Sequence, residues 1–338
     1  MLVLMAQVPV RLRLRRAICA NIVAGIWPPG STLPGRETLA RNYHVSLRSL
    51  QQCIDDLIAD GHVISHGGHG TVVATDPPCL RDVLLLLPDD SGPGLATSLR
   101  VAAGRWARGH RFRIGSLSDM AKAVDMLLDH RICGCVVCGE LDGLDAALRE
   151  RLLAVGPVVV IGFMSEGFVR LHLDLFASVR WALRRLIAAG HRRIAVFGAA
   201  RRSGLLYQRM RGWLRTAGAD DDPCLLHELL PPANHVAPGL VDLLWSLPLP
   251  RRPDAVLITD DHLVPALTRA LARVGVDPKV VLAHANRPGR SRAHVACQRY
   301  GFDADDILRH ALELLGHHGH QPVTIRTMQP RILAGSPR

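Results

Sequence analysis

Lysine and aromatic residues are both scarce in this sequence, and each shortage limits what can be concluded. Of the 41 basic residues only Lys122 and Lys279 are lysine, a bias that genomic base composition can produce without selection at a surface. The net charge of +11 is therefore weak evidence for a nucleic-acid partner. Aromatic residues make up only 4% of the chain, so few rings are available to stack on a ligand.

Long apolar segments are also missing. The longest nearly apolar run covers residues 152–164 and is broken by glycine and proline. A helix that crosses a membrane needs about 20 apolar residues. The N-terminal segment MLVLMAQVPV has no basic residue before its apolar part, which is the wrong order for a secretory signal. We therefore expect a cytoplasmic protein with no membrane partner.

The common signatures of enzymes do not occur. No G-x-G-x-x-G, P-loop or G-x-S-x-G motif follows a predicted strand, and no arrangement of nucleophile, base and orienting group is evident. The C-x-x-C within Cys133–Cys138 has no second ligand pair at zinc-binding spacing, so we interpret it as part of a buried strand. We expect no catalytic residue, no cofactor and no metal.

The N-terminal segment has the pattern of three helices and a hairpin. Apolar spacing predicts a helix over residues 10–26, and the prolines that follow it lead into a short helix over 35–43. Ser46 is a natural N-cap for a third helix over 47–61. Two β-rich runs around a glycine-rich tip predict a hairpin over 62–74. Three helices and a hairpin form a winged helix.

The charge of this segment favours contact with DNA over a purely structural helical domain, which is the alternative. Residues 1–52 hold seven arginines against one acid, Glu37, and such a basic face attracts phosphates. A helix-turn-helix protein presents the first turns of its recognition helix to base edges. The candidate DNA-contacting residues are Arg36, Ser46, Arg48, Ser49, Gln51, Gln52, His69 and Gly70.

Residues 10–74 resemble the winged helix of the GntR family. The resemblance is carried by IVAGIWPPGSTLPGRETLARNYHVSLRSL and by the glycine-rich wing GGHGTVV. It implies that Arg36 and the residues that open the third helix contact DNA. The family has an arginine directly after V-S, whereas Leu47 stands there in this chain and the arginine follows at Arg48. One residue is about 100° of helix, so Arg48 either substitutes from another angle or recognises bases differently.

Beyond a short proline-containing linker over residues 76–82, predicted strands alternate with amphipathic helices. The strands are predicted at 83–88, 112–116, 133–139, 158–163, 193–198, 255–260 and 279–285. Such alternation is typical of α/β proteins with parallel sheets, and about 260 residues suffice for two similar lobes. Ligands of open α/β sheets bind where strands end.

Polar residues stand at several of these strand ends. Asp89 and Asp90 follow the first predicted strand, Asp260 and Asp261 follow the run AVLIT, and Asn286 follows VVLAHA. Each is a candidate ligand-binding residue, with the alternative that it is an ordinary helix cap or turn residue.

Residues 82–338 resemble the sensor domain of LacI/GalR-type regulators. The resemblance rests on LIAAGHRRIAVFGAARRSGLLYQRMRGW and PDAVLITDDHLVPALTRAL. It implies that Arg209 and Asp261 bind ligand, and an arginine with an aspartate suits a polyol because one donates and the other accepts hydrogen bonds. The aromatic pair that this family has after the first strand is replaced here by DDSGPG.

Together these observations predict an α/β protein with an N-terminal winged helix and a sensor of two parallel-sheet, Rossmann-like lobes of periplasmic-binding-protein type. The predicted domains are residues 1–75 and 83–338, joined by the linker. We expect a ligand-responsive transcriptional repressor that acts as a homodimer on double-stranded operator DNA and senses a small polar metabolite such as a sugar. The alternative is a small-molecule sensor without regulated DNA binding.

Overall fold

The structure is a computed structural model of the chain. It describes residues 9–66, 70–89, 94–106, 109–139, 141, 144–155, 157–162, 167–198, 204–229, 235–285, 297–316 and 325–333. Within these residues, no helix is long and apolar enough to cross a membrane. The chain divides into two compact units, the first made mainly of residues 1–89 and 103–170, the second mainly of 171–310.

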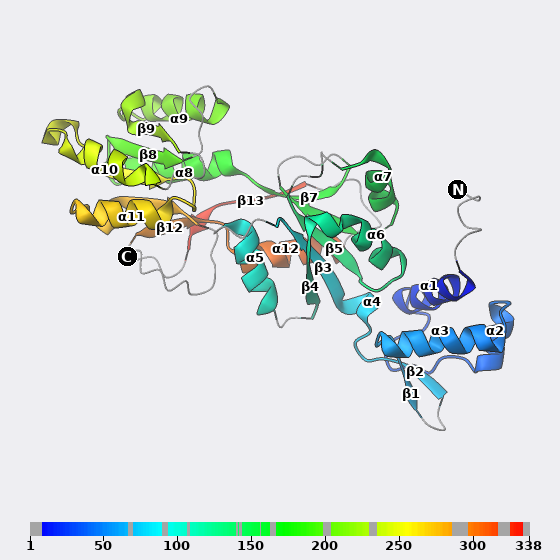
Figure 1. Ribbon diagram of the computed structural model, residues 1–338. Coiled ribbons are helices and arrows are strands. Elements are labelled where there is room, and N and C mark those ends of the chain that lie inside the picture. Colours follow the sequence, from blue (N-terminus) through cyan, green and yellow to red (C-terminus); the bar gives the residue numbers. More distant parts are fainter. Residues whose placement is uncertain are drawn as a thin grey trace. The chain divides into compact units, whose positions relative to one another are not determined.

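The first unit begins with the predicted winged helix (Figure 1). Its helices are α1 (Val10–Val23), α2 (Arg36–Asn42) and α3 (Leu47–Ala59), and its hairpin pairs β1 (Val63–His66) with β2 (Gly70–Val73). The hairpin strands run antiparallel, with Val63 opposite Val73 and His66 opposite Gly70. Gly70 has φ 87°, a left-handed conformation that favours glycine.

One apolar core holds the winged helix together. The stripe predicted for α3 is buried through Leu50, Ile54 and Leu57, which pack in a cluster with Leu14 and Ile18 of α1. Cys79, in the short helix α4 (Pro78–Arg81), belongs to the same cluster. The predicted linker therefore contributes a helix to the core of the winged helix.

The rest of the first unit contains a parallel sheet. The parallel strands are β3 (Asp82–Leu87), β4 (Arg111–Ser116), β5 (Gly134–Cys138) and β6 (Val158–Ile161). With β7 (Val169–Leu173) and β13 (Ile325–Met328), they form a six-stranded sheet of order β13-β7-β6-β5-β3-β4. Two helices of this unit are α6 (Met120–Leu128) and α7 (Ala146–Val155). Every residue of β5 is buried, Cys135 and Cys138 included, as the sequence predicts.

The second unit is built on another six-stranded sheet, of order β14-β12-β11-β10-β8-β9, in which only the short β14 is antiparallel. Most of α5 and α12 belongs to this unit, and the chain enters it along β7. Its elements are α5 (Leu95–Gly104), β7 (Val169–Leu173), α8 (Leu175–Ala188), β8 (Ile194–Gly198), α9 (Leu205–Thr216), β9 (Leu226–Glu228), α10 (Ala237–Ser246), β10 (Ala255–Ile258), α11 (Val264–Arg273), β11 (Val281–His284), β12 (Gln298–Gly301), α12 (Ala304–Gly316), β13 (Ile325–Met328) and β14 (Arg331–Ile332).

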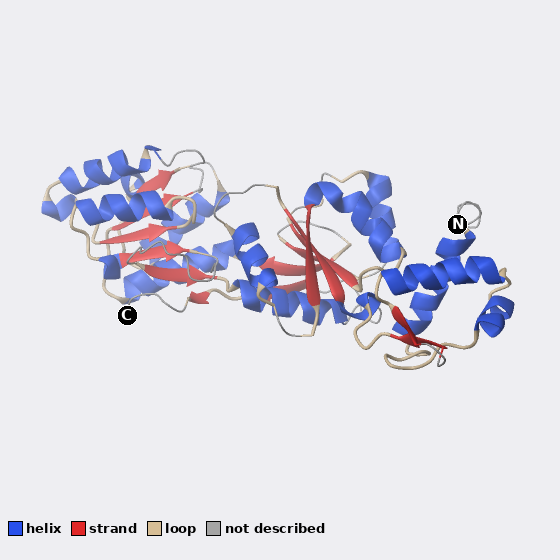
Figure 2. Ribbon diagram, turned by 60° about the horizontal axis from the view of Figure 1, so that its bottom comes forward, coloured by secondary structure: helices blue, strands red, loops and turns tan. Residues whose placement is uncertain are grey.

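Helices cover both faces of this sheet, as Figure 2 shows. Along β8, Ala195 and Phe197 pack in one apolar cluster with residues of α10 and α11, whereas Ile194 and Val196 pack in another with residues of α8 and α9. A strand buried on both faces has a continuous apolar sequence, which explains runs such as AVLI in β10. The predicted fold class is confirmed, while the domain boundaries at residues 75 and 83 stay predictions.

Candidate nucleic-acid interface and ligand site

The N-terminus of α3 is built as the sequence predicts. The Ser46 hydroxyl accepts a hydrogen bond from the backbone N–H of Ser49 at 3.1 Å, which satisfies one of the free donors at the helix start. The Ser46 and Ser49 hydroxyl oxygens also lie 2.9 Å apart. The positive end of the helix dipole and these hydroxyls together form a surface suited to a phosphate.

Two exposed arginines lie at helix starts in this domain. Arg36 is the first residue of α2, and Arg48 is the second residue of α3. In the described part of the chain, neither guanidinium has a hydrogen bond or ion pair with another residue. Both are therefore available to a phosphate or a base edge. Leu47 lies beside Arg48 and is 53% exposed.

The other predicted DNA-contacting residues differ in how free they are to reach DNA. Gln52 is exposed, but the Gln51 amide donates a hydrogen bond to Asp55 at 2.7 Å on the same helix. Gly70 is exposed at the start of β2. His69 lies outside the described residues.

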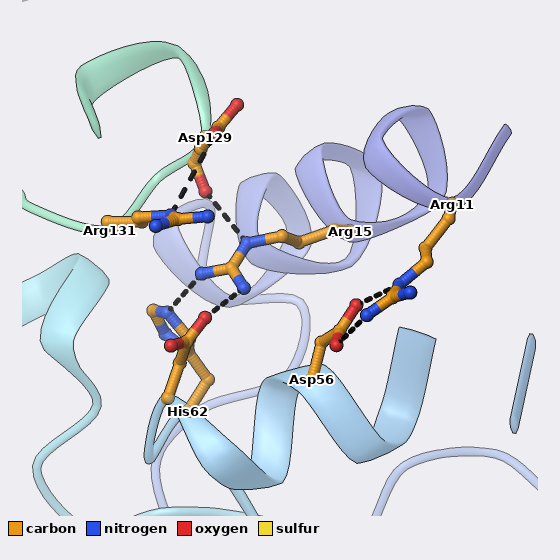
Figure 3. Close-up of polar contacts among 7 residues, drawn as sticks. Arg11, Arg15, Asp56, His62, Asp129 and Arg131 are labelled. Carbon is orange, nitrogen blue, oxygen red and sulfur yellow. Dashed lines mark hydrogen bonds and ion pairs between the residues drawn. The ribbon is translucent and has the colours of Figure 1, made fainter. Parts of the chain in front are cut away.

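The structure corrects the expectation that the arginines of residues 1–52 form one basic face. Figure 3 shows Arg11 and Arg15 reaching from α1 toward carboxylates. Arg11 pairs with Asp56, and Arg15 pairs with Asp60. Arg16 donates to the Asp129 carboxylate at 2.9 Å. These three cations are neutralised within the protein. Arg13 on α1, Arg36 and Arg41 on α2, and Arg48 on α3 have no carboxylate partner among the described residues.

Arg15 is buried where α1 meets the turn after α6. Its side chain donates to Asp60, to the Asp129 carbonyl oxygen at 3.3 Å and to Nε2 of His62 at 3.1 Å. Burial lowers the pKa of His62 below its ordinary value. Sequence analysis did not find this cluster, because its members come from separate elements and no local pattern connects them.

In the second unit, Asp261 has the strongest features of a ligand-binding group. It follows β10, which pairs in parallel with β8, so the two strands end at the same edge of the sheet. Burial raises the pKa of Asp261 to about 6, and the neighbouring Asp260 contributes in the same direction. α11 has no side-chain N-cap, so the Asp261 carboxylate does not cap this helix, and the alternative that remains is an ordinary turn residue.

The backbone at Gly94 also lies close to the side chain of Asp261. A Cβ atom at Gly94, at the start of α5, would lie 3.9 Å from both carboxylate oxygens of Asp261 and from Nε2 of His262. His262 donates its backbone N–H to Asp260 at 3.0 Å, which fixes the turn that carries these side chains.

Of the other ligand candidates, the structure describes Arg209 and Asp89. Arg209 is exposed on α9, with its guanidinium carbon 5.0 Å from the centre of the Phe176 ring. No contact joins Arg209 to Asp261 among the described residues. Asp89 is exposed after β3. Asp90 and Asn286 lie outside the described residues. Phe176, which sequence analysis missed, is an aromatic ring two residues after Asp174, the N-cap of α8.

Comparison with known proteins agrees with both halves of this description. Residues 11–73 match the family described as bacterial regulatory proteins, gntR family, and residues 183–331 match the periplasmic binding protein-like domain. The chain thus joins a GntR-type helix-turn-helix domain to a periplasmic-binding-protein-like domain.

Among curated proteins, the HTH-type transcriptional repressor STM4068 of Salmonella typhimurium is 42% identical over 60 residues, 18% of this chain and 25% of that protein. The match to the curated relatives covers only 25–32% of their length.

Two solved structures show the fold of the remainder. A regulatory protein of the LacI family from Chloroflexus aggregans has a TM-score of 0.57 at 17% identity, over 74% of this chain and 96% of its own. A LacI family transcriptional regulator from Lactobacillus casei with bound sucrose has a TM-score of 0.52 at 20% identity, over 75% of this chain and 98% of its own.

Proposed function

We propose that the chain is a cytoplasmic transcriptional repressor that binds operator DNA and responds to a small polar metabolite. The observation that carries the proposal is a pair of exposed arginines, Arg36 and Arg48, at the helix starts of a GntR-type domain. Neither has a partner among the residues that the structure describes. A regulator is favoured over an enzyme because the matched gntR family and the curated repressor are regulatory proteins.

In the proposed complex, α3 enters the major groove with its N-terminal turns toward base edges. Arg48 and Gln52 contact bases or phosphates, Ser46 and Ser49 hold a phosphate, and Gln51 contacts DNA only after releasing Asp55. The wing, with His69 and Gly70, follows the backbone or the minor groove. A homodimer presents two such helices to two half-sites.

The proposed effector binds at the edge of the sheet where Asp261 lies. An ionised carboxylate accepts hydrogen bonds from hydroxyl or amino groups, and Arg209 supplies donors from α9. Asp89, Asp90 and Asn286 are further proposed contacts. The sucrose bound by the Lactobacillus casei regulator makes a sugar the first compound to test.

The test of DNA binding compares single-arginine variants. Genomic fragments are selected for binding, and affinity is measured by fluorescence anisotropy at several salt concentrations. We expect Arg36→Ala and Arg48→Ala each to weaken binding, Arg48→Ala by about 1–3 kcal/mol if it reads a base. If either arginine instead holds a phosphate, its loss lowers the salt slope by about one.

The control is Arg100→Ala, which removes an exposed arginine from α5 in the second unit. It should bind DNA as the unaltered chain does. Equal affinity of the unaltered chain and both test variants would refute DNA recognition through α2 and α3. A complete lack of DNA binding by the unaltered chain would favour the alternative of a sensor without regulated DNA binding, for which the exposed Leu47 is the supporting observation.

The test of the effector site uses sucrose and glucose in calorimetry and in the DNA-binding assay. We expect Arg209→Ala and Asp261→Ala to lose the response to the sugar while keeping operator binding, because effector and DNA are coupled only through differential binding to two states. A coupling of about 1–3 kcal/mol is typical of such proteins. Unchanged sugar affinity in both variants would remove these residues from the site.

A further inference from the structure

Three potential metal ligands converge inside the winged helix. They are Cys19 on α1, His62 between α3 and β1, and Cys79 on α4. Both sulfur atoms and one ring nitrogen of His62 lie within 4.8 Å of one another. The sequence predicts no metal because these residues are 43 and 17 positions apart (62 − 19 and 79 − 62), which resembles no zinc-binding spacing.

All three side chains are buried, and one of their polar atoms has no partner. Their exposed fractions are 0% for Cys19 and His62 and 2% for Cys79. The His62 ring receives a hydrogen bond from Arg15 at Nε2, while Nδ1 is buried without a hydrogen-bond partner among the described residues. A buried polar atom without a partner costs about 1–3 kcal/mol, so it calls for an explanation.

We propose that Cys19, His62 and Cys79 bind a thiophilic d¹⁰ metal ion, Zn²⁺ or Cu⁺, with Nδ1 of His62 as the nitrogen ligand. Two thiolates and an imidazole are the donors that select these ions. Cu⁺ is satisfied by the three protein ligands. Zn²⁺ takes a fourth, and His62 and Pro78 line a cavity of about 540 Å³ that has room for a water.

The protons involved balance without an oxidant or reductant. Arginine only donates hydrogen bonds, so in the metal-free protein Nε2 of His62 is the acceptor and Nδ1 carries the proton. When the metal binds, both thiols release their protons to solvent, and the imidazole proton moves from Nδ1 to Nε2. Arg15 then gives up His62 and keeps Asp60 and the Asp129 carbonyl oxygen.

The position of the site gives the metal a structural consequence. Its ligands tie α1 and the end of α3 to α4, the helix that leads directly into β3. A bound ion would therefore stiffen the connection between the winged helix and the sheet of the first unit. Because the metal displaces the protons of both thiols, binding should strengthen as pH rises.

The test measures metal binding by the whole chain, independently of DNA. Reduced, metal-free protein is titrated separately with Zn²⁺ and Cu⁺, and the bound ion is counted by mass spectrometry. Co²⁺ serves as a spectroscopic probe, because a cobalt–thiolate bond gives a charge-transfer band in the near ultraviolet. We expect one ion per chain.

Cys19→Ala and Cys79→Ala should weaken binding by more than the roughly 10–100-fold that the loss of an outer-shell partner costs. Cys53→Ala is the matched control, because Cys53 is 0% exposed in the same apolar cluster but is not one of the three converging ligands. It should keep full stoichiometry. Circular dichroism of each variant checks that the fold is retained.

The proposal is overturned if Cys19→Ala and Cys79→Ala bind either ion as the unaltered chain does, or if the unaltered chain binds neither. A Cys19–Cys79 disulfide that forms in air, in a protein that binds no metal when reduced, would also overturn it. Tight binding of only one ion supports the site and identifies the metal. Failure of the site would leave the DNA-binding proposal intact.

Discussion

Replacement of Arg15 by methionine should loosen the winged helix far more than the same replacement of Arg11. The two residues lie one turn apart on α1, and their aspartate partners are one turn apart as well. Arg11 pairs with Asp56, and Arg15 pairs with Asp60. Their surroundings differ. The Arg15 side chain is 4% exposed, whereas the Arg11 side chain is 52% exposed.

The magnitude follows from the three contacts that Arg15 makes. A hydrogen bond to a charged group contributes about 1.5–3 kcal/mol, and Arg15→Met removes those to Asp60, His62 and the Asp129 carbonyl oxygen. The sum is reduced because Asp60 is 40% exposed and regains water, and because methionine keeps much of the packing. We expect a loss of about 3 kcal/mol, or about two orders of magnitude in the equilibrium for local opening.

Hydrogen exchange read by mass spectrometry resolves this effect by segment. In a metal-free buffer, peptides from α1 and α3 should lose about a hundredfold in protection in Arg15→Met, while peptides from the second unit stay unchanged. Arg11→Met should show no measurable loss, because an exposed ion pair contributes little to stability. Equal effects of the two replacements, or none from Arg15→Met, would refute the assignment of Arg15 as a buried anchor.

Two further predictions concern pH. Since burial raises the pKa of Asp261 to about 6 from 3.8, its contribution to stability is present below pH 3.8 and is lost as pH rises through 6. Asp261→Asn should therefore be more stable than the unaltered chain at pH 7, by about 2 kcal/mol in urea unfolding, with the gap closing by pH 4; a gap that does not change with pH would contradict this. Since burial lowers the pKa of His284 to about 4 from 6.5, the folded chain loses stability as pH falls from 6.5 to 4, by up to about 3 kcal/mol. His284→Phe should remove most of that acid sensitivity, and an unaltered acid profile in the variant would show that other groups cause it.

The local elements of this protein could be predicted from sequence because their signals lie within a few residues. The apolar stripe of α3, its Ser46 cap and the continuous apolar run of β3 each depend on near neighbours along the chain. The predicted strands and helices therefore lie close to the observed ones. Strands with weaker sequence signals were not predicted. Among them are the short strands β9 and β12, which have few apolar residues of their own.

What each charged or sulfur-bearing side chain contacts was decided only by the tertiary structure. Sequence shows seven arginines near the N-terminus, but the chain path determines that Arg15 is buried beside His62 while Arg48 stays exposed. Cys19 and Cys79 are likewise far apart along the chain, and only the packing of α4 against α1 brings them together. Helix and strand periodicity reflects interactions over a few residues, whereas burial and ion pairing depend on segments that meet only after the chain has folded.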